Sequence, residues 1–169
     1  MAKPSSRILV INDEPLVLRE FVKGLNAAAR TLDNPLGIGF VGVPTAKQAL
    51  ATIEAEGDLQ AVLVDDTLYT LGSNSRKKLQ MSALELVQRI TRLRPELDVY
   101  IVIAQEKEDD VVDALFAESV DGYFYREERD YRGIYRILNA QIQERARTPF
   151  YDQLKNYVWM AKDQWHTPG

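Results

Sequence analysis

The 169-residue sequence predicts an α/β domain: a doubly wound, five-stranded parallel sheet with a linker helix at its C-terminal end. Short apolar runs, typical of strands buried on both faces, recur five times along the chain. Stretches with helical spacing of apolar residues lie between these runs. Such alternation with short connections implies parallel strands covered by helices on both faces. We expect residues 1–147 to form this domain and residues 148–169 to form the linker helix and the start of a further domain.

Five segments are predicted to be strands. The first, Arg7-Ile-Leu-Val-Ile-Asn12, is an almost continuous apolar run. The others are expected at residues 38–43, 61–64, 99–103 and 122–125. In sheets of this kind a binding site lies beyond the C-terminal ends of the strands.

Helical patterns follow each of these strands. They predict helices over residues 15–33, 45–57, 82–94, 109–117 and 130–147. Thr45 is a suitable N-cap for the second helix, and Ser82 with Glu85 forms a capping box for the third. The positions expected on the helical stripes are Leu16, Glu20 or Phe21, and Leu25; Ala46, Ala49, Leu50 and Ile53; Leu84, Val87, Ile90 and Leu93; and Ile134, Ile137, Leu138 and Ile142.

Composition excludes several classes of function. The chain has no cysteine and one histidine, His166, so disulfide frameworks, thiolate metal sites and histidine-based catalytic clusters are excluded. The net charge of −4 argues against nucleic acid as a partner. No apolar run reaches the roughly 18 residues of a membrane span, and the N-terminus lacks a signal-peptide pattern. We therefore expect a cytoplasmic protein with neither membrane nor nucleic acid as a partner.

Acidic residues follow two of the predicted strands. Asp13 and Glu14 end the first, and Asp65 and Asp66 end the third. These strands are neighbours in a doubly wound sheet, so the carboxylates are expected to converge, where they could hold Mg²⁺ and present one aspartate to a phosphoryl group. The alternative is that they are solvated loop residues and acids favoured by helix dipoles. Position alone leaves both readings open.

This arrangement resembles a response-regulator receiver domain, a receiver/flavodoxin-like fold, over about residues 7–146. The resemblance rests on Asp13-Glu14 after the first strand, Val64-Asp65 at the phosphoacceptor end of the third, and Asp121-Gly122-Tyr123 at the fifth. Residues 44–50 also resemble the start of the second receiver helix. The resemblance implies that Asp65 occupies the phosphoacceptor position.

Two positions depart from the receiver pattern. Receivers carry threonine or serine at the end of the fourth strand, where this chain has Val102-Ile-Ala-Gln105. Receivers end the fifth strand with lysine and proline, where this chain has Arg126 and no proline. Arginine does not substitute simply for a compact ammonium group. The resemblance therefore implies a pseudo-receiver, in which Arg126 pairs with Asp65 or Asp13 and the acidic pocket is a vestigial phosphoacceptor region.

A second resemblance lies in the tail. Residues 148–154, Thr-Pro-Phe-Tyr-Asp-Gln-Leu, and 165–169, Trp-His-Thr-Pro-Gly, resemble the junction after the receiver-like wing domain of ornithine/lysine/arginine decarboxylases. These are pyridoxal-phosphate enzymes of fold type I. The resemblance implies that the cofactor and its Schiff-base lysine belong to a catalytic domain after Gly169. We expect no cofactor and no enzyme activity in this chain alone.

Apolar residues of the tail are expected to form an interface. They are Phe150, Leu154, Tyr157, Val158 and Trp159. Their expected partners are the catalytic domain of the same protein and other subunits, which makes a homo-oligomer the expectation. Residues 67–80 form a long predicted loop with a basic triplet, Arg76 to Lys78, that either contacts an acidic partner or is simply solvated.

Two functions follow from these patterns. The first is a pseudo-receiver domain of a basic amino-acid decarboxylase, serving assembly or regulation. The second is a phosphorylatable receiver of a two-component system, modified on Asp65 by a histidine kinase. The sequence does not indicate which amino acid such a decarboxylase would act on, nor the size of the oligomer.

Overall fold

The computed structural model describes residues 6–66, 82–103 and 120–147. Three predicted features lie outside these ranges: the basic loop at residues 67–80, the short helix at 109–117 and the tail at 148–169, which includes the interface residues Phe150, Leu154, Tyr157, Val158 and Trp159.

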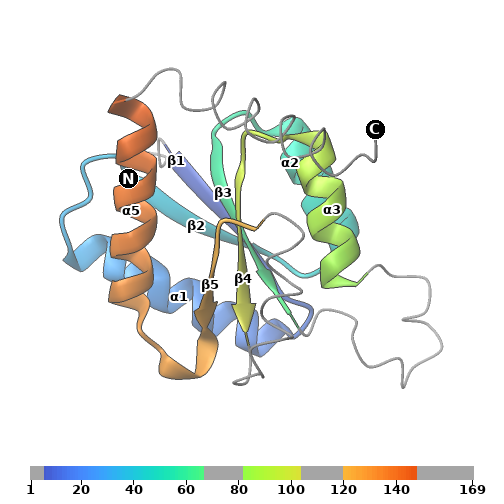
Figure 1. Ribbon diagram of the computed structural model, residues 1–169. Helices are drawn as coiled ribbons and strands as arrows, with labels where there is room; N and C mark the ends of the chain where they lie inside the picture. The colour runs from blue at the N-terminus through green and yellow to red at the C-terminus, as the bar shows by residue number, and fades with distance from the viewer. Residues whose placement is uncertain (1–5, 67–81, 104–119, 148–169) are drawn as a thin grey trace, which may run out of the picture.

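The sheet has five parallel strands in the order β2-β1-β3-β4-β5 (Figure 1). The strands are β1 (Ser6–Ile11), β2 (Ile38–Val43), β3 (Leu59–Asp65), β4 (Asp98–Ile103) and β5 (Gly122–Tyr125). This confirms the predicted fold class and places all five predicted strands to within two residues. The first strand lies inside the sheet, so the chain winds outward from it in both directions.

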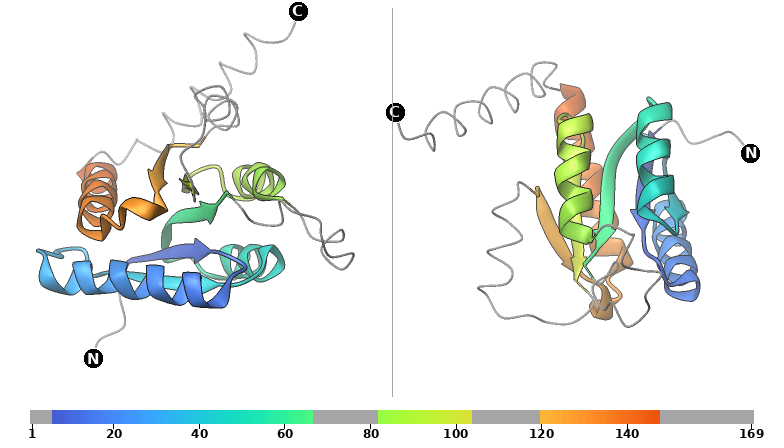
Figure 2. Two further views of the ribbon diagram at one scale, coloured as in Figure 1. Left: turned by 90° about the horizontal axis from the view of Figure 1, so that it is seen from below. Right: turned by 90° about the vertical axis from the view of Figure 1, so that its right-hand side faces the viewer.

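Helices cover both faces of this sheet, as Figures 1 and 2 show. The described helices are α1 (Pro15–Thr31), α2 (Ala46–Ala55), α3 (Ala83–Leu93), the short 3₁₀ helix η2 (Arg126–Glu128) and α5 (Tyr131–Arg147). Buried residues of α1 and α5 pack in one apolar cluster, and those of α2 and α3 pack in another. The domain is therefore a three-layer α/β sandwich.

Alternation along the strands explains why the sequence shows continuous apolar runs. Ile8 and Val10 of β1 belong to the cluster with α1 and α5, whereas Leu9 and Ile11 belong to the cluster with α2 and α3. Successive side chains of a strand point to opposite faces, and both faces are covered here. Every position of such a strand therefore favours an apolar residue.

Local signals set where the helices begin. The hydroxyl oxygen of Thr45 accepts a hydrogen bond from the backbone N–H of Gln48 at 3.1 Å, and that of Ser82 accepts one from Glu85 at 3.2 Å. Both predicted N-caps are confirmed. Between α1 and α5, a Cβ atom on Gly24 would lie 2.5 Å from the ring of Tyr131. Glycine at this position therefore allows the two helices to approach closely.

Some predicted stripe positions are wrong. Leu16 is 79% exposed and Ile137 is 49% exposed, while Leu84 and Leu93 at the two ends of α3 are about 40% exposed (39% and 42%). α1 buries the expected Phe21 and Leu25 together with Leu18, Ala28 and Ala29. Apolar residues three or four positions apart are compatible with two adjacent faces of a helix. Packing against the sheet determines which of these faces is buried.

The outer edge of β2 is covered by two asparagine side chains. Asn26 of α1 accepts from the backbone N–H of Phe40 at 2.9 Å and donates to its carbonyl at 3.0 Å. Asn34 makes the same pair of bonds with Ile38, at 2.9 and 3.1 Å. These amides take the place that a neighbouring strand would occupy, so this part of the edge is closed to strand addition.

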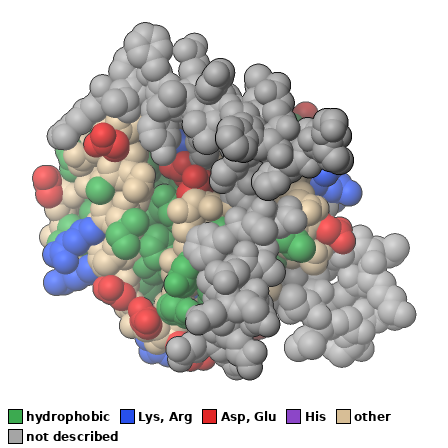
Figure 3. Space-filling view, viewed as in Figure 1, with side chains coloured by type: hydrophobic (Ala, Val, Ile, Leu, Met, Phe, Trp, Pro, Cys, Tyr) green, Lys and Arg blue, Asp and Glu red, His purple; other side chains and the backbone are tan. Residues whose placement is uncertain are grey.

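Five large apolar side chains are exposed among residues 6–66, 82–103 and 120–147. Figure 3 shows apolar side chains gathered on one face over α5 and β5. The exposed large hydrophobic residues of these two elements are Ile137 and Tyr123. No helix among the described residues has both the length and the apolarity needed to cross a membrane.

Candidate functional site

The site lies where β1 and β3 end at the same edge of the sheet. Asp65 is the last residue of β3, a strand that pairs with β1 on one side and with β4 on the other. Its side chain is 3% exposed. A carboxylate removed from water to this extent requires compensating charge and hydrogen bonds.

Arg126 supplies that charge. It follows β5 directly, and its guanidinium Nη1 donates to Asp65 Oδ2 at 2.7 Å. Because β4 lies between β3 and β5, the arginine side chain crosses the end of β4 to reach the aspartate. The expectation that Arg126 would contact Asp65 or Asp13 is confirmed for Asp65.

Asn12 is a second partner, and the sequence did not indicate it. Asn12 directly follows β1. Its Nδ2 donates to Asp65 Oδ2 at 2.9 Å, and its Oδ1 accepts from the backbone N–H of Glu14 at 2.8 Å. Asn12 is 3% exposed. The sequence feature that could have indicated Asn12 is its place as a polar residue at the end of an apolar run, one position before Asp13 and Glu14.

The other predicted acids lie around this pair in different environments. Glu14 is exposed and occupies the N-cap position of α1 without a side-chain capping hydrogen bond, and Asp13 is half-buried. Asp66 is 4% exposed, and its backbone N–H donates to the carbonyl of Val102 at 2.9 Å. Among residues 6–66, 82–103 and 120–147, no three His, Cys, Asp or Glu side chains form a group that could hold a metal ion.

These contacts do not fit a divalent cation. Magnesium requires several oxygen ligands in octahedral geometry and usually keeps some of its waters. Asp65 Oδ2 already accepts from a guanidinium and from an amide. The small cavity that Asn12, Asp65 and Arg126 help to line has a volume of about 10 Å³. This volume is at the lower limit for a single water molecule, so a hydrated cation would have to displace Arg126.

Solved structures of similar proteins share this architecture. A CheY-like receiver domain from Methanospirillum hungatei JF-1 superposes with a TM-score of 0.61 at 20% identity, over 84% of this chain and 97% of that chain. The chain has the receiver fold. A receiver domain from Clostridium thermocellum matches with a TM-score of 0.61 at 18% identity, over 83% of this chain and 97% of that one.

An orphan response regulator of H. pylori has the same receiver fold, with a TM-score of 0.58 at 18% identity over 83% of this chain and 99% of its own. No protein-family model and no curated protein sequence matches the chain. Identities this low establish the receiver fold and leave function to the residues of the site.

Proposed function

We propose that this chain is a pseudo-receiver: a receiver-fold domain that serves assembly or regulation of a larger protein and is not switched by phosphorylation. One observation carries the proposal, namely that the buried carboxylate of Asp65 is held by Arg126 at 2.7 Å. An aspartate in this state is an anion neutralised within the fold, and it is poorly placed to attack a phosphodonor.

Space and charge support the same conclusion. A phosphoryl group on Asp65 would carry a charge of about −2 and three acceptor oxygens at neutral pH. The cavity of about 10 Å³ beside Asp65 cannot contain them. Phosphorylation would therefore require that Arg126, and the chain around it, move away from their positions beside the aspartate.

The larger protein that we propose is a pyridoxal-phosphate-dependent decarboxylase of ornithine, lysine or arginine. The support is the resemblance of residues 148–154 and 165–169 to the wing–catalytic junction of those enzymes. In this proposal the domain contacts its own catalytic domain and other subunits of a cytoplasmic homo-oligomer. The cofactor and the reacting groups belong to the catalytic domain, and this chain contributes none of them.

A phosphorylatable receiver is the second candidate. The observation that favours it is the position of Asp65, at the carboxyl end of β3 in a fold whose solved neighbours include response regulators. The two candidates differ in one measurable property, which is the ability of Asp65 to form an acyl phosphate.

Incubation of the chain with acetyl phosphate and Mg²⁺ should leave its intact mass unchanged, because Asp65 is buried and paired with Arg126. Mass spectrometry measures the outcome, with an established receiver domain treated in parallel as the positive control. A stable, stoichiometric gain of one phosphoryl group that disappears in Asp65→Asn would support the second candidate and reject the pseudo-receiver.

The decarboxylase assignment has a separate test. Protein expressed from the full-length gene should show the absorbance of an internal pyridoxal-phosphate aldimine, and borohydride reduction should fix the cofactor on a lysine outside these 169 residues. A full-length product that binds no pyridoxal phosphate and carries a DNA-binding output domain would contradict this assignment.

A further inference from the structure

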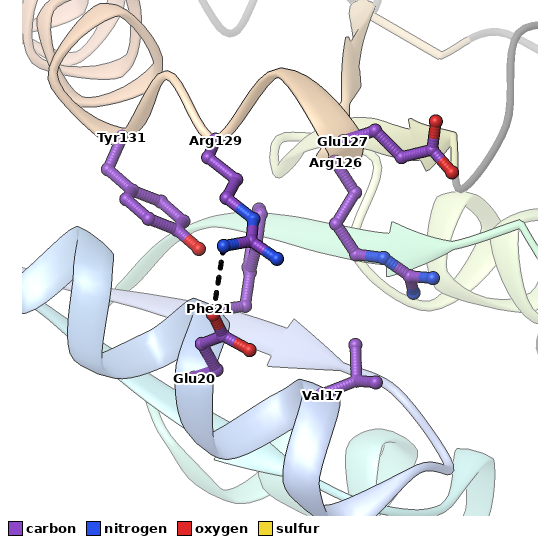
Figure 4. A pocket seen from close by; sticks show the side chains of 7 residues that line it. All are labelled: Val17, Glu20, Phe21, Arg126, Glu127, Arg129 and Tyr131. Atoms are coloured by element: carbon purple, nitrogen blue, oxygen red, sulfur yellow. Dashed lines mark ion pairs between the residues drawn. The ribbon is translucent and has the colours of Figure 1, made fainter.

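A hollow of about 220 Å³ lies between α1 and the segment that joins β5 to α5. Figure 4 shows that Arg126 and Arg129 both extend from that segment toward α1, whereas Glu127 turns away. The residues that line the hollow are Val17, Glu20, Phe21, Arg126, Glu127, Arg129 and Tyr131. Arg126 also lines the small cavity at Asp65, so one guanidinium joins the two spaces.

The two guanidiniums have donors left over. A guanidinium carries five N–H donors, and within the described part of the chain Arg126 uses only Nη1, on Asp65. The guanidinium of Arg129 forms an ion pair with Glu20 at 3.8 Å, which is longer than a hydrogen bond, and the side chain is 72% exposed. Both arginines can therefore donate to a further acceptor in the hollow.

The remaining walls suit an anion of modest size. Glu20 pairs with Arg129 at 3.8 Å and Asp65 pairs with Arg126, so a bound anion would compete with one carboxylate at each arginine (Figure 4). Burial, followed by the nearby charge of Glu20, raises the pKa of Tyr131 above its usual value, which keeps the phenol neutral and able to donate a hydrogen bond. Val17 and Phe21 provide an apolar floor on α1.

We propose that this hollow binds a small oxyanion, a carboxylate or phosphate group of a soluble ligand, between Arg126 and Arg129. Arginine donates to either group in a two-point, charge-assisted arrangement. The bound anion competes with Asp65 for Arg126, and the ligand thereby regulates the site at the end of β3. The inference rests on the Asp65–Arg126 pair of the proposed function, and does not depend on which larger protein contains the domain.

Competition of this kind is reciprocal. If a bound anion weakens the Asp65–Arg126 pair, then removal of the Asp65 charge should strengthen binding of the anion. Coupling between sites is typically about 5- to 150-fold in affinity. A nonspecific surface attraction has no such dependence on a buried aspartate.

Calorimetric titrations of the 169-residue chain with inorganic phosphate and, separately, with acetate test the proposal. At low ionic strength we expect saturable binding at one site. Arg129→Gln, a change at an exposed side chain, should weaken binding about tenfold, and Asp65→Asn should strengthen it about fivefold or more. Glu14→Gln removes the same charge from an exposed residue outside the hollow, and should change the affinity less than twofold.

Binding of phosphate alone, acetate alone or both would each support the site and identify its chemistry. No saturation with either anion at tens of millimolar would overturn it, as would an equal gain in affinity from Glu14→Gln and Asp65→Asn. Arg129→Gln keeps the test decisive if Asp65→Asn fails to fold. Acyl-phosphate formation in the mass assay would reject the pseudo-receiver without affecting these titrations, so the two proposals can fail separately.

Discussion

Replacing Arg126 with methionine should lower the free energy of unfolding by about 3 kcal/mol. Methionine keeps much of the apolar stem and removes the charge, which leaves the Asp65 carboxyl, 3% exposed, without the guanidinium that neutralises it. Loss of one partner of a buried pair costs more than loss of both. Urea denaturation followed by circular dichroism measures the change.

A double-mutant cycle with Asp65→Asn separates this pair from its surroundings. The double variant should be more stable than the sum of the single effects predicts, by about 1–3 kcal/mol. The matched control is Arg129→Met on the same segment, where the side chain is 72% exposed and its ion pair spans 3.8 Å. That change should stay within about 0.5 kcal/mol. Strict additivity in the cycle would contradict direct coupling between Arg126 and Asp65.

At the opposite end of the sheet, Arg145→Met should destabilise the domain by about 3–5 kcal/mol. The guanidinium forms an ion pair with Asp98 at 2.9 Å and donates to the backbone carbonyls of Gln60, at 3.1 Å, and Glu96. Its side chain is 10% exposed and that of Asp98 is 4% exposed. These contacts join the last turns of α5 to the starts of β3 and β4, so their loss affects three elements at once.

Arg136→Met is the control for this prediction because Arg136 is an exposed arginine of the same helix. Thermal and urea unfolding of both variants, compared with the unmodified chain, give the two changes in stability. An Arg145→Met variant as stable as the Arg136→Met variant would show that the contacts of Arg145 contribute little to the fold.

The sheet could be predicted from the sequence because strands that are buried on both faces are apolar at nearly every position. Each strand is a short apolar run, and the acids of the site stand where two of these runs end. Asp65 was identified on this basis and Arg126 from the resemblance to receivers, and their contact at 2.7 Å follows because β3 and β5 end at the same edge of the sheet, on either side of β4. Thr45 and Ser82 were identifiable as caps because capping depends on residues three positions away.

Other features depend on three-dimensional context that a pattern does not contain. Asn12 was missed because an amide carries no charge, and its role appears only when the fold directs its two ends to Asp65 and to the backbone of Glu14. Leu16 was misplaced because the phase of an amphipathic helix is decided by the surface against which it packs. The four acids were grouped by their positions along the chain, whereas Glu14 lies exposed at the start of α1.

The position of Arg126 next to β5 has a consequence for the accessibility of Asp65 over time. Among the described strands, β5 has four residues and lies at the edge of the sheet, paired with β4. Short edge strands detach in local opening events whose free energy is below that of global unfolding. Detachment of β5 would withdraw Arg126, which directly follows it, from Asp65. The rate at which any reagent modifies Asp65 is then set by the population of this partly open form, which amide hydrogen exchange at residues 122–125 reports directly.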